Sequence, residues 1–233
     1  MDNKCRIFLM RSSNHDNNIL TSEGRERAWK IGVFLSNNQI KLNKVVTSPQ
    51  LRAIETALKV LVGAERTSVP IYTNDNLDAL SSETEPVQQY ISAFATKMEC
   101  VNVADFFYKI LSDPSFRTKC KKRAKSFAHI EAILLCRAQE GADFLIDLSR
   151  QCQKQSILVV SHGLSRIEMV LLNLEKGNPF SLDDLGLVKI FFAPADMVEL
   201  TFISERLVEK RIYSAKYILD STSPTTFEYK SNV

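Results

Sequence analysis

Three basic side chains follow short apolar runs along the chain, where buried strands are expected to end. Arg11 comes directly after one run, His162 closely follows another, and Arg52 lies just beyond a third. The runs predicted as strands are Ile7–Met10, Ile157–Val160 and Lys44–Thr47. Because ligands bind at the carboxyl ends of parallel strands, we expect these three side chains to meet in one crevice.

Two guanidinium groups and an imidazole near helix starts form a binding site for a phosphate or a similar oxyanion. Arginine offers paired donors in a fixed geometry, and helix starts add backbone N–H groups. Taken alone, each arginine would more commonly be solvated and the histidine would more commonly be structural. The three residues together are what indicates an oxyanion site. Gly163, next to His162, allows close approach of the backbone to a ligand.

The elements that must position these residues alternate between strand and helix. Further strands are predicted at Val69–Tyr72, Met197–Ile203 and Val208–Tyr213, the last two paired. Helices are predicted to begin at Thr21, at Ser48-Pro49 and at Pro86, and to cover Ala124–Cys152 with a break near Gly141. This alternation predicts the α/β class, as a three-layer α/β/α sandwich with a mainly parallel central sheet.

The predicted domain organisation is a single domain over residues 1–220 with a helical cap inserted around residues 94–155. Residues 221–233 are expected to form a loose tail. The insertion contains a basic run, Arg117–Lys125. It could attract an anionic ligand or an acidic partner, but a solvated helical face is the preferred interpretation.

Composition excludes several classes of protein. The net charge of +3 over 233 residues is too small to indicate nucleic-acid binding. Five cysteines without C-x-x-C spacing and three histidines argue against a zinc site and for a reducing compartment. The start lacks the apolar run of a signal peptide, and no stretch approaches the ~20 apolar residues of a membrane span. We therefore expect a cytoplasmic protein without metal, cofactor or membrane partner.

Four segments carry motifs in a recognisable order: "FLMR" (Phe8–Arg11), "LTSEGRERA" (Leu20–Ala28), "SPQLRAIETA" (Ser48–Ala57) and "ILVVSHG" (Ile157–Gly163). Together they resemble the histidine phosphatase superfamily, which includes the cofactor-dependent phosphoglycerate mutases. The resemblance implies the fold of that family. It also implies that Arg11, Arg52 and His162 contact the oxygens of a phosphoryl group.

One position departs from the family pattern and bears on catalysis. The pattern places a histidine directly after the first arginine, and that histidine attacks phosphorus to form a phosphoenzyme. Here the position is Ser12, followed by Ser13 where glycine is usual. A serine hydroxyl needs a general base to attack, and the sequence offers none beside Ser12. Loss of a covalent nucleophile costs on the order of 10⁶ in turnover. Ser13 and Asn14 also depart from the pattern, which favours natural divergence over an engineered change.

His15 lies three residues past Ser12 and is interpreted as a histidine at the rim of the crevice. It is a poor substitute nucleophile, because attack needs placement to within about 1 Å. The helix arginines Arg25 and Arg166 are interpreted as solvated.

The family also uses a carboxylic acid to protonate the leaving oxygen. Candidates here are Asp78 and Glu83. Glu85, before Pro86, is interpreted as a charge at a helix start, with Ser82 completing a capping box.

Three hypotheses follow. The leading one is a phosphate-pocket protein whose covalent catalysis is lost or impaired by Ser12, and which binds a phosphorylated small molecule or a phosphoprotein. The second is a working phosphomonoesterase that uses another nucleophile or an activated water. The third is a protein-interaction scaffold with a vestigial pocket. The sequence does not predict the oligomeric state or name the ligand.

Overall fold

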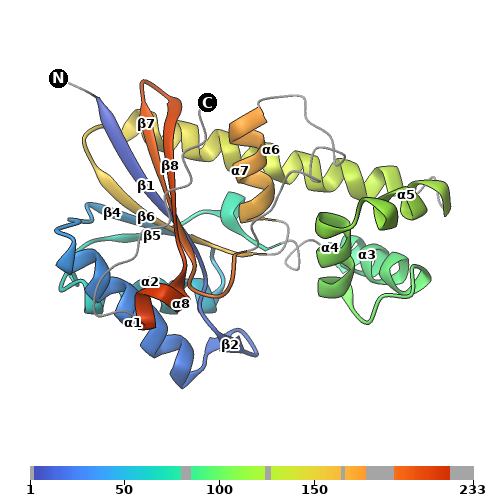
Figure 1. The fold of residues 1–233 in the computed structure, drawn as a ribbon, viewed down its shortest axis with the longest axis horizontal. Helices are drawn as coiled ribbons and strands as arrows, with labels where there is room; N and C mark the ends of the chain where they lie inside the picture. Colours follow the sequence, from blue (N-terminus) through green and yellow to red (C-terminus); the bar gives the residue numbers. More distant parts are fainter. Residues whose placement is uncertain (1–2, 80–84, 124–126, 164–165, 177–191, 221–233) are drawn as a thin grey trace. The chain divides into compact units, whose positions relative to one another are not determined.

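The computed structural model describes residues 3–79, 85–123, 127–163, 166–176 and 192–220, and contains a six-stranded sheet (Figure 1). The strand order is β5-β4-β6-β1-β7-β8. The strands are β1 (Lys4–Arg11), β4 (Lys44–Thr47), β5 (Ile71–Thr73), β6 (Ser156–Ser161), β7 (Met197–Ile203) and β8 (Arg206–Tyr213). The first four are parallel to one another, β7 is antiparallel to β1, and β8 is antiparallel to β7. The predicted, mainly parallel sheet is confirmed.

The chain divides into two compact units. The sheet unit comprises Met1–Asp78, Asp143–Gly163 and Phe192–Val233; the helical unit comprises Ala79–Ala142 and Leu164–Phe191. The single domain over 1–220 with an insertion around 94–155 stays a prediction. The predicted tail at 221–233 lies outside the described residues.

Helices cover both faces of the sheet. One face carries α1 (Ser22–Asn37), α2 (Leu51–Gly63) and α8 (Ala215–Asp220), and the other carries the last turns of α6 (Phe127–Gln151) (Figure 1). The smaller elements of this unit are the hairpin β2 (His15–Asp16) and β3 (Ile19–Leu20) and the 3₁₀ helix η1 (Asp75–Leu77). The predicted three-layer α/β/α arrangement is confirmed.

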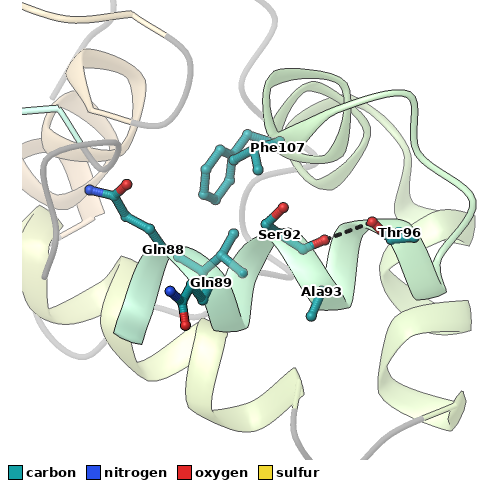
Figure 2. Close-up of a pocket in the computed structure, with 8 residues that line it drawn as sticks. Gln88, Gln89, Ser92, Ala93, Thr96 and Phe107 are labelled. Atoms are coloured by element: carbon teal, nitrogen blue, oxygen red, sulfur yellow. Dashed lines mark hydrogen bonds between the residues drawn. The ribbon is translucent and has the colours of Figure 1, made fainter. Parts of the chain in front are cut away.

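The helical unit has its own core, rich in phenylalanine. It is built from α3 (Glu85–Lys97), α4 (Val103–Ser112), α5 (Pro114–Arg123), the first part of α6, and α7 (Ile167–Lys176). Phe94 packs against both Phe106 and Phe127, with ring centroids 5.7 Å and 5.8 Å away. A pocket of about 600 Å³ lies beside them, lined mainly by α3, with Phe107 of α4 on its other side (Figure 2).

The break predicted near Gly141 does not occur, because α6 runs unbroken from Phe127 to Gln151. Ala138, Ala142 and Leu145 are all buried, so the apolar stripe continues through the glycine. Packing of this stripe outweighs the roughly 1 kcal/mol that glycine costs inside a helix. Among the described residues no helix is long and apolar enough to cross a membrane.

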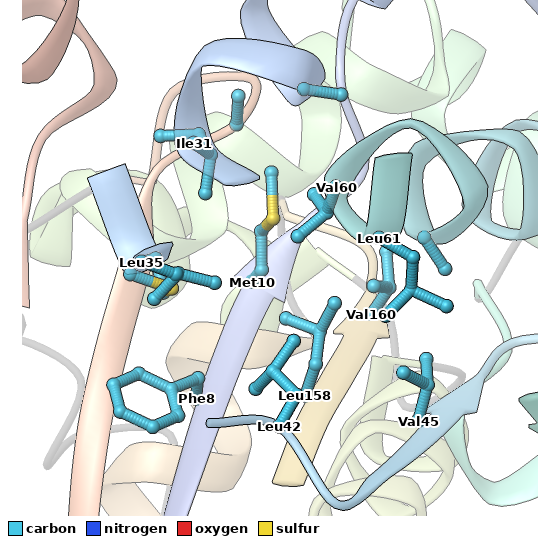
Figure 3. Close-up of a cluster of buried hydrophobic side chains, with 14 of the residues drawn as sticks. Phe8, Met10, Ile31, Leu35, Leu42, Val45, Val60, Leu61, Leu158 and Val160 are labelled. Carbon is cyan, nitrogen blue, oxygen red and sulfur yellow. The ribbon is translucent and has the colours of Figure 1, made fainter. Parts of the chain in front are cut away.

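The core of the sheet unit explains why the first apolar run becomes a strand. Phe8 and Met10 point to the face covered by α1 and α2, where Ile31 and Val60 meet them (Figure 3). Leu158 of β6 lies on the same face. These side chains are fully buried, and each contributes about 1.5–3 kcal/mol relative to exposure. The packing fixes the register of β1 and therefore where Arg11 emerges.

Of the three predicted helix starts, the one at Pro86 lies one residue after the observed start of α3 at Glu85, and the other two have different outcomes. Thr21 caps α1 as expected, accepting a hydrogen bond from the Gly24 N–H at 3.0 Å. The start at Ser48-Pro49 was placed two residues early, because α2 begins at Leu51 after an N-cap residue, Gln50, whose side chain makes no capping bond. The Ser48 hydroxyl is instead engaged outside the helix, as described below.

The basic run lies mostly on α5 and behaves largely as a solvated face. Lys119 and Arg123 approach Glu99, and Lys121 approaches Glu131. Arg117 differs, since it is only 2% exposed and its Nη1 donates to the Ile110 carbonyl at 2.7 Å, at the end of α4. Lys125 lies outside the described residues.

Helices α1 and α2 approach so closely that two glycines are required. A Cβ at Gly32 would lie 2.1 Å from the Val60 carbonyl oxygen, and one at Gly63 would lie 2.0 Å from that of Trp29. These neighbours are backbone atoms, which cannot move aside without shifting a helix.

We predict that Gly63→Ala destabilises the protein by about 1–3 kcal/mol, the usual cost of overpacking a close contact. Urea unfolding followed by circular dichroism measures this change. Leu58→Ala on the same helix is the matched control, because Leu58 is 48% exposed and should change stability far less. Equal stability of Gly63→Ala and wild type would contradict the close packing.

Candidate functional site

The carboxyl ends of neighbouring parallel strands bring the candidate residues together. Strand β6 lies between β4 and β1, so the residues after all three strands are adjacent. The Ser48 N–H donates to the Val160 carbonyl at 2.9 Å, and the Ser12 N–H donates to that of Ser161 at 2.8 Å. The Ser161 hydroxyl donates to the Leu77 carbonyl at 2.7 Å, which ties the end of η1 to the same edge.

His162 stands at the centre of a chain of hydrogen bonds. Arg52 Nε donates to His162 Nδ1 at 3.2 Å, so Nδ1 is the unprotonated nitrogen and the proton is on Nε2. His162 Nε2 lies 2.8 Å from Ser48 Oγ and therefore donates to it. Ser48 in turn donates to Asp78 Oδ1 at 3.0 Å. The chain thus runs from Arg52 through His162 and Ser48 to Asp78.

The surroundings of His162 favour its neutral form. The side chain is only 5% exposed. Burial, followed by the positive charge of Arg52, lowers the pKa of His162 to about 3, although Asp78 acts in the opposite direction. His162 is therefore neutral at physiological pH in the unliganded protein.

Arg52 is held by a hairpin that the sequence did not reveal. Strands β2 and β3 pair around Asn17 and Asn18, whose φ angles of 46° and 67° are left-handed. Asparagine tolerates this conformation, which a tight two-residue hairpin requires. Arg52 Nη1 donates to Asn18 Oδ1 at 3.0 Å. Burial lowers the pKa of Arg52, and the charge of Arg11 lowers it further.

Arg11 lies against the glycine that follows His162. A Cβ at Gly163 would come within 2.6 Å of Arg11 Cδ, so only glycine leaves room for this side chain. Arg11 Nη1 donates to the Phe192 carbonyl. The sequence predicted close approach of a ligand at Gly163, and in the structure the side chain there is Arg11.

Among the described residues, Ser12 has no partner that could activate it. The residue is 4% exposed, and its hydroxyl makes no hydrogen bond to any described residue. The Ser13 N–H donates to Thr56 Oγ1 at 3.0 Å, which fixes the loop, and the buried Ser13 Oγ has no partner in the described part of the chain.

His15 lies in β2 and is exposed. Partial burial of the ring, followed by the charges of Arg52 and Arg11, lowers the pKa of His15. The charge of His15 in turn lowers the pKa of His162. It therefore lies within electrostatic range of the crevice.

Other sequence candidates have separate outcomes. Glu83, with Ser82, lies outside the described residues. Arg25 is 3.8 Å from Glu55 and 41% exposed. Arg166 is not solvated as expected: it is 2% exposed in the helical unit, and its Nη1 donates to the Arg137 carbonyl at 2.5 Å.

The site therefore offers guanidinium donors, a neutral imidazole and one carboxylate, Asp78. Within the described ranges no group of three or more histidine, cysteine, aspartate or glutamate side chains could hold a metal ion. This donor set suits an oxyanion. Asn18 and Ser48 are members that sequence reasoning missed. Ser48 could have been identified from the sequence, because it lies in the same motif segment as Arg52. Asn18 is recognisable as a site residue only once the hairpin is formed.

Comparisons with known proteins show what the sequence and the fold are similar to. Residues 9–82 match the profile of the histidine phosphatase superfamily (branch 1). No curated protein matches the chain in sequence.

Solved structures share the fold at low sequence identity. A phosphoglycerate mutase from Bacillus anthracis has a TM-score of 0.59 and 17% identity, over 94% of this chain and 96% of that one. A mycobacterial glucosyl-3-phosphoglycerate phosphatase has a TM-score of 0.54 and 18% identity, over 84% and 89%. A phosphoserine phosphatase mutant from Entamoeba histolytica, with a histidine replaced by alanine, was solved with phosphoserine; it has a TM-score of 0.52 and 14% identity, over 86% and 95%. The chain has the phosphoglycerate mutase-like fold.

We predict that His162 makes the protein less stable in acid. The folded state holds its pKa near 3, below the unfolded value of about 6.5, so the unfolded chain binds the proton more readily. Stability is then lost as the pH falls below about 6.5, by about 2 kcal/mol between pH 7 and pH 5. Urea unfolding at both pH values measures this loss. His162→Gln should lack this part of the pH dependence, and an equal pH dependence in both proteins would contradict the burial of a neutral imidazole.

We also predict that Gly163→Ala displaces Arg11 and lowers the affinity for inorganic phosphate to that of Arg11→Ala. The added methyl group occupies the space of the Arg11 side chain, which can swing away, so the fold itself should survive. Isothermal titration calorimetry measures the affinity. Unchanged phosphate affinity in Gly163→Ala would show that phosphate binding does not depend on the present position of the Arg11 side chain.

Proposed function

We propose that this chain belongs to the histidine phosphatase superfamily and uses its crevice to bind the phosphoryl group of a phosphorylated ligand. In this proposal Arg11, Arg52 and His162 bind the phosphoryl oxygens. Ser12 occupies the place of the nucleophilic histidine, so the protein does not form a phosphoenzyme. The observation that carries the proposal is that these basic groups meet at the carboxyl ends of neighbouring parallel strands, beside a serine with no activating base.

The charges of the crevice favour an anion. Arg11 and Arg52 are close enough for the charge of one to lower the pKa of the other. Arg52 donates to an imidazole nitrogen and an amide oxygen, both neutral acceptors. A phosphoryl oxygen is a stronger acceptor, because it carries the charge opposite to that of the guanidinium and suits its paired donors. Binding a phosphoryl group would therefore relieve repulsion and strengthen the hydrogen bonds of both arginines.

The chemistry of position 12 supports binding without turnover. A serine nucleophile needs a neighbouring base to take its proton. The one imidazole buried in the crevice, His162, already uses both nitrogens for Arg52 and Ser48. Asp78 bonds to Ser48 and is the described candidate for the acid of the family pattern.

The ligand class we propose is a phosphorylated small molecule, with a phosphoprotein as the alternative. Support comes from a structure of the same fold in which a histidine is replaced by alanine and phosphoserine is bound. A pocket of this fold can therefore hold a phosphomonoester when a histidine is missing. The five cysteines are free, which supports the reducing cytoplasm as the proposed location.

We predict that inorganic phosphate and phosphoserine bind to the wild-type protein, and that Arg52→Gln weakens this binding about 10- to 100-fold. The expected factor corresponds to the loss of one hydrogen bond between charged groups. Calorimetric titration measures it. Arg27→Gln is the matched control, since Arg27 pairs with Glu23 on the surface of α1. Absence of phosphate affinity, or equal effects of both substitutions, would favour a scaffold with a vestigial pocket.

Turnover separates binding from catalysis. We expect no release of phosphate from generic phosphomonoesters above that of the control His162→Ala. Turnover that persists through purification and disappears in His162→Ala or Arg52→Ala would instead establish a working phosphomonoesterase. If Ser12→Ala also abolished it, Ser12 would be the nucleophile.

A further inference from the structure

The hydrogen bonds of His162 in the unliganded crevice differ from those that a bound oxyanion requires. At present His162 Nδ1 accepts from Arg52 Nε. An oxyanion placed against Arg52 would compete for this donor. Nδ1 would then face an anion with its lone pair, which is repulsive unless the nitrogen gains a proton.

On the opposite side of the ring, a carboxylate is in place to balance the charge that this proton would add. His162 Nε2 donates to Ser48, and Ser48 donates to Asp78, so a carboxylate is linked to the ring through one hydroxyl. Asp78 Oδ1 is also 3.8 Å from Nε2. Both groups would remain in place with the ring doubly protonated, because an imidazolium donates from both nitrogens.

We propose, on the basis of the function proposed above, that His162 takes up one proton at Nδ1 when an oxyanion binds in this crevice. Ser48 and Asp78 are the positioning residues that make this uptake possible. Ser48 accepts the hydrogen bond from Nε2 and so keeps the ring turned with Nδ1 toward the ligand. Asp78, through Ser48, supplies the negative charge that balances the imidazolium. No bond is broken in this step: solvent supplies the proton, and the ligand accepts a hydrogen bond from it.

Charged groups from every neighbouring element act in the expected direction. Arg52 of α2, Arg11 of β1 and His15 of β2 lower the pKa of His162, and Asp78 raises it. A bound dianion would offset the two arginines and add to the effect of Asp78. An opposite charge within about 4–6 Å raises the pKa of a histidine by roughly 1–3 units. The ligand therefore raises the pKa of the ring.

Sulfate is the probe of choice, because it stays a dianion throughout the pH range in which histidine titrates, and any pH dependence then belongs to the protein. Calorimetry of wild type at pH 5, in two buffers of different ionisation enthalpy, counts the protons taken up. A rise of roughly 1–3 units in the pKa of His162 from about 3 corresponds at this pH to uptake of about 0.1–0.9 proton, and we expect the affinity to rise as the pH falls. Ring nitrogen shifts should show Nε2 protonated in the free protein and both nitrogens protonated in the complex. The variant His15→Gln should keep this uptake, since His15 is the other imidazole in range.

Asp78→Asn and Ser48→Ala test the positioning role. Asp78→Asn should still bind sulfate, but the rise in affinity should shift to lower pH by about one unit or more. Ser48→Ala should also shift the rise in affinity to lower pH, because it removes the link from Nε2 to Asp78. Ser149→Ala on α6 is its control, because it also removes one buried hydroxyl. Sulfate binding without proton uptake, or uptake unchanged in Asp78→Asn, would overturn this inference and leave the proposed binding function standing. If sulfate and phosphate fail to bind, the proposed function itself is wrong.

Discussion

The crevice depends on the hydrogen bond that Arg52 donates to the neutral imidazole of His162. This bond places a half-buried cation beside a buried ring, so the ring is neutral in the unliganded protein. It also sets the tautomer, which in turn directs Nε2 toward Ser48 and orients the hydroxyl toward Asp78. One contact between α2 and the end of β6 thus determines the protonation state of the site.

The surrounding fold serves to hold that contact in place. The order β4-β6-β1 brings three strand ends together, and the packing of Phe8 and Met10 fixes the register of β1. Close approach of α1 to α2, permitted by Gly32 and Gly63, holds the helix that carries Arg52.

The sequence predicted the parts of the site that depend on local patterns. Apolar runs ending in Arg11 and in Ser161-His162 are typical of buried parallel strands, and the structure contains both strands. What the sequence could not predict depends on contacts between distant segments. The bond from Arg52 to Asn18 needs a folded hairpin, and the role of Ser48 needs Asp78, thirty residues away, to return to the same edge. A helix continuing through Gly141 was missed for the same reason, since packing outweighed local propensity.

We propose that the crevice retains a phosphoryl-binding geometry and lacks its nucleophile at position 12. The most direct measurement is phosphorus NMR of the Ser12→His variant mixed with p-nitrophenyl phosphate, whose leaving group needs no proton donor. We expect an acid-labile phosphorus–nitrogen signal on the protein and release of nitrophenol, neither of which wild type gives. A folded Ser12→His variant that binds phosphate yet forms no phosphoprotein would show that the missing nucleophile is not what separates this crevice from a catalytic one.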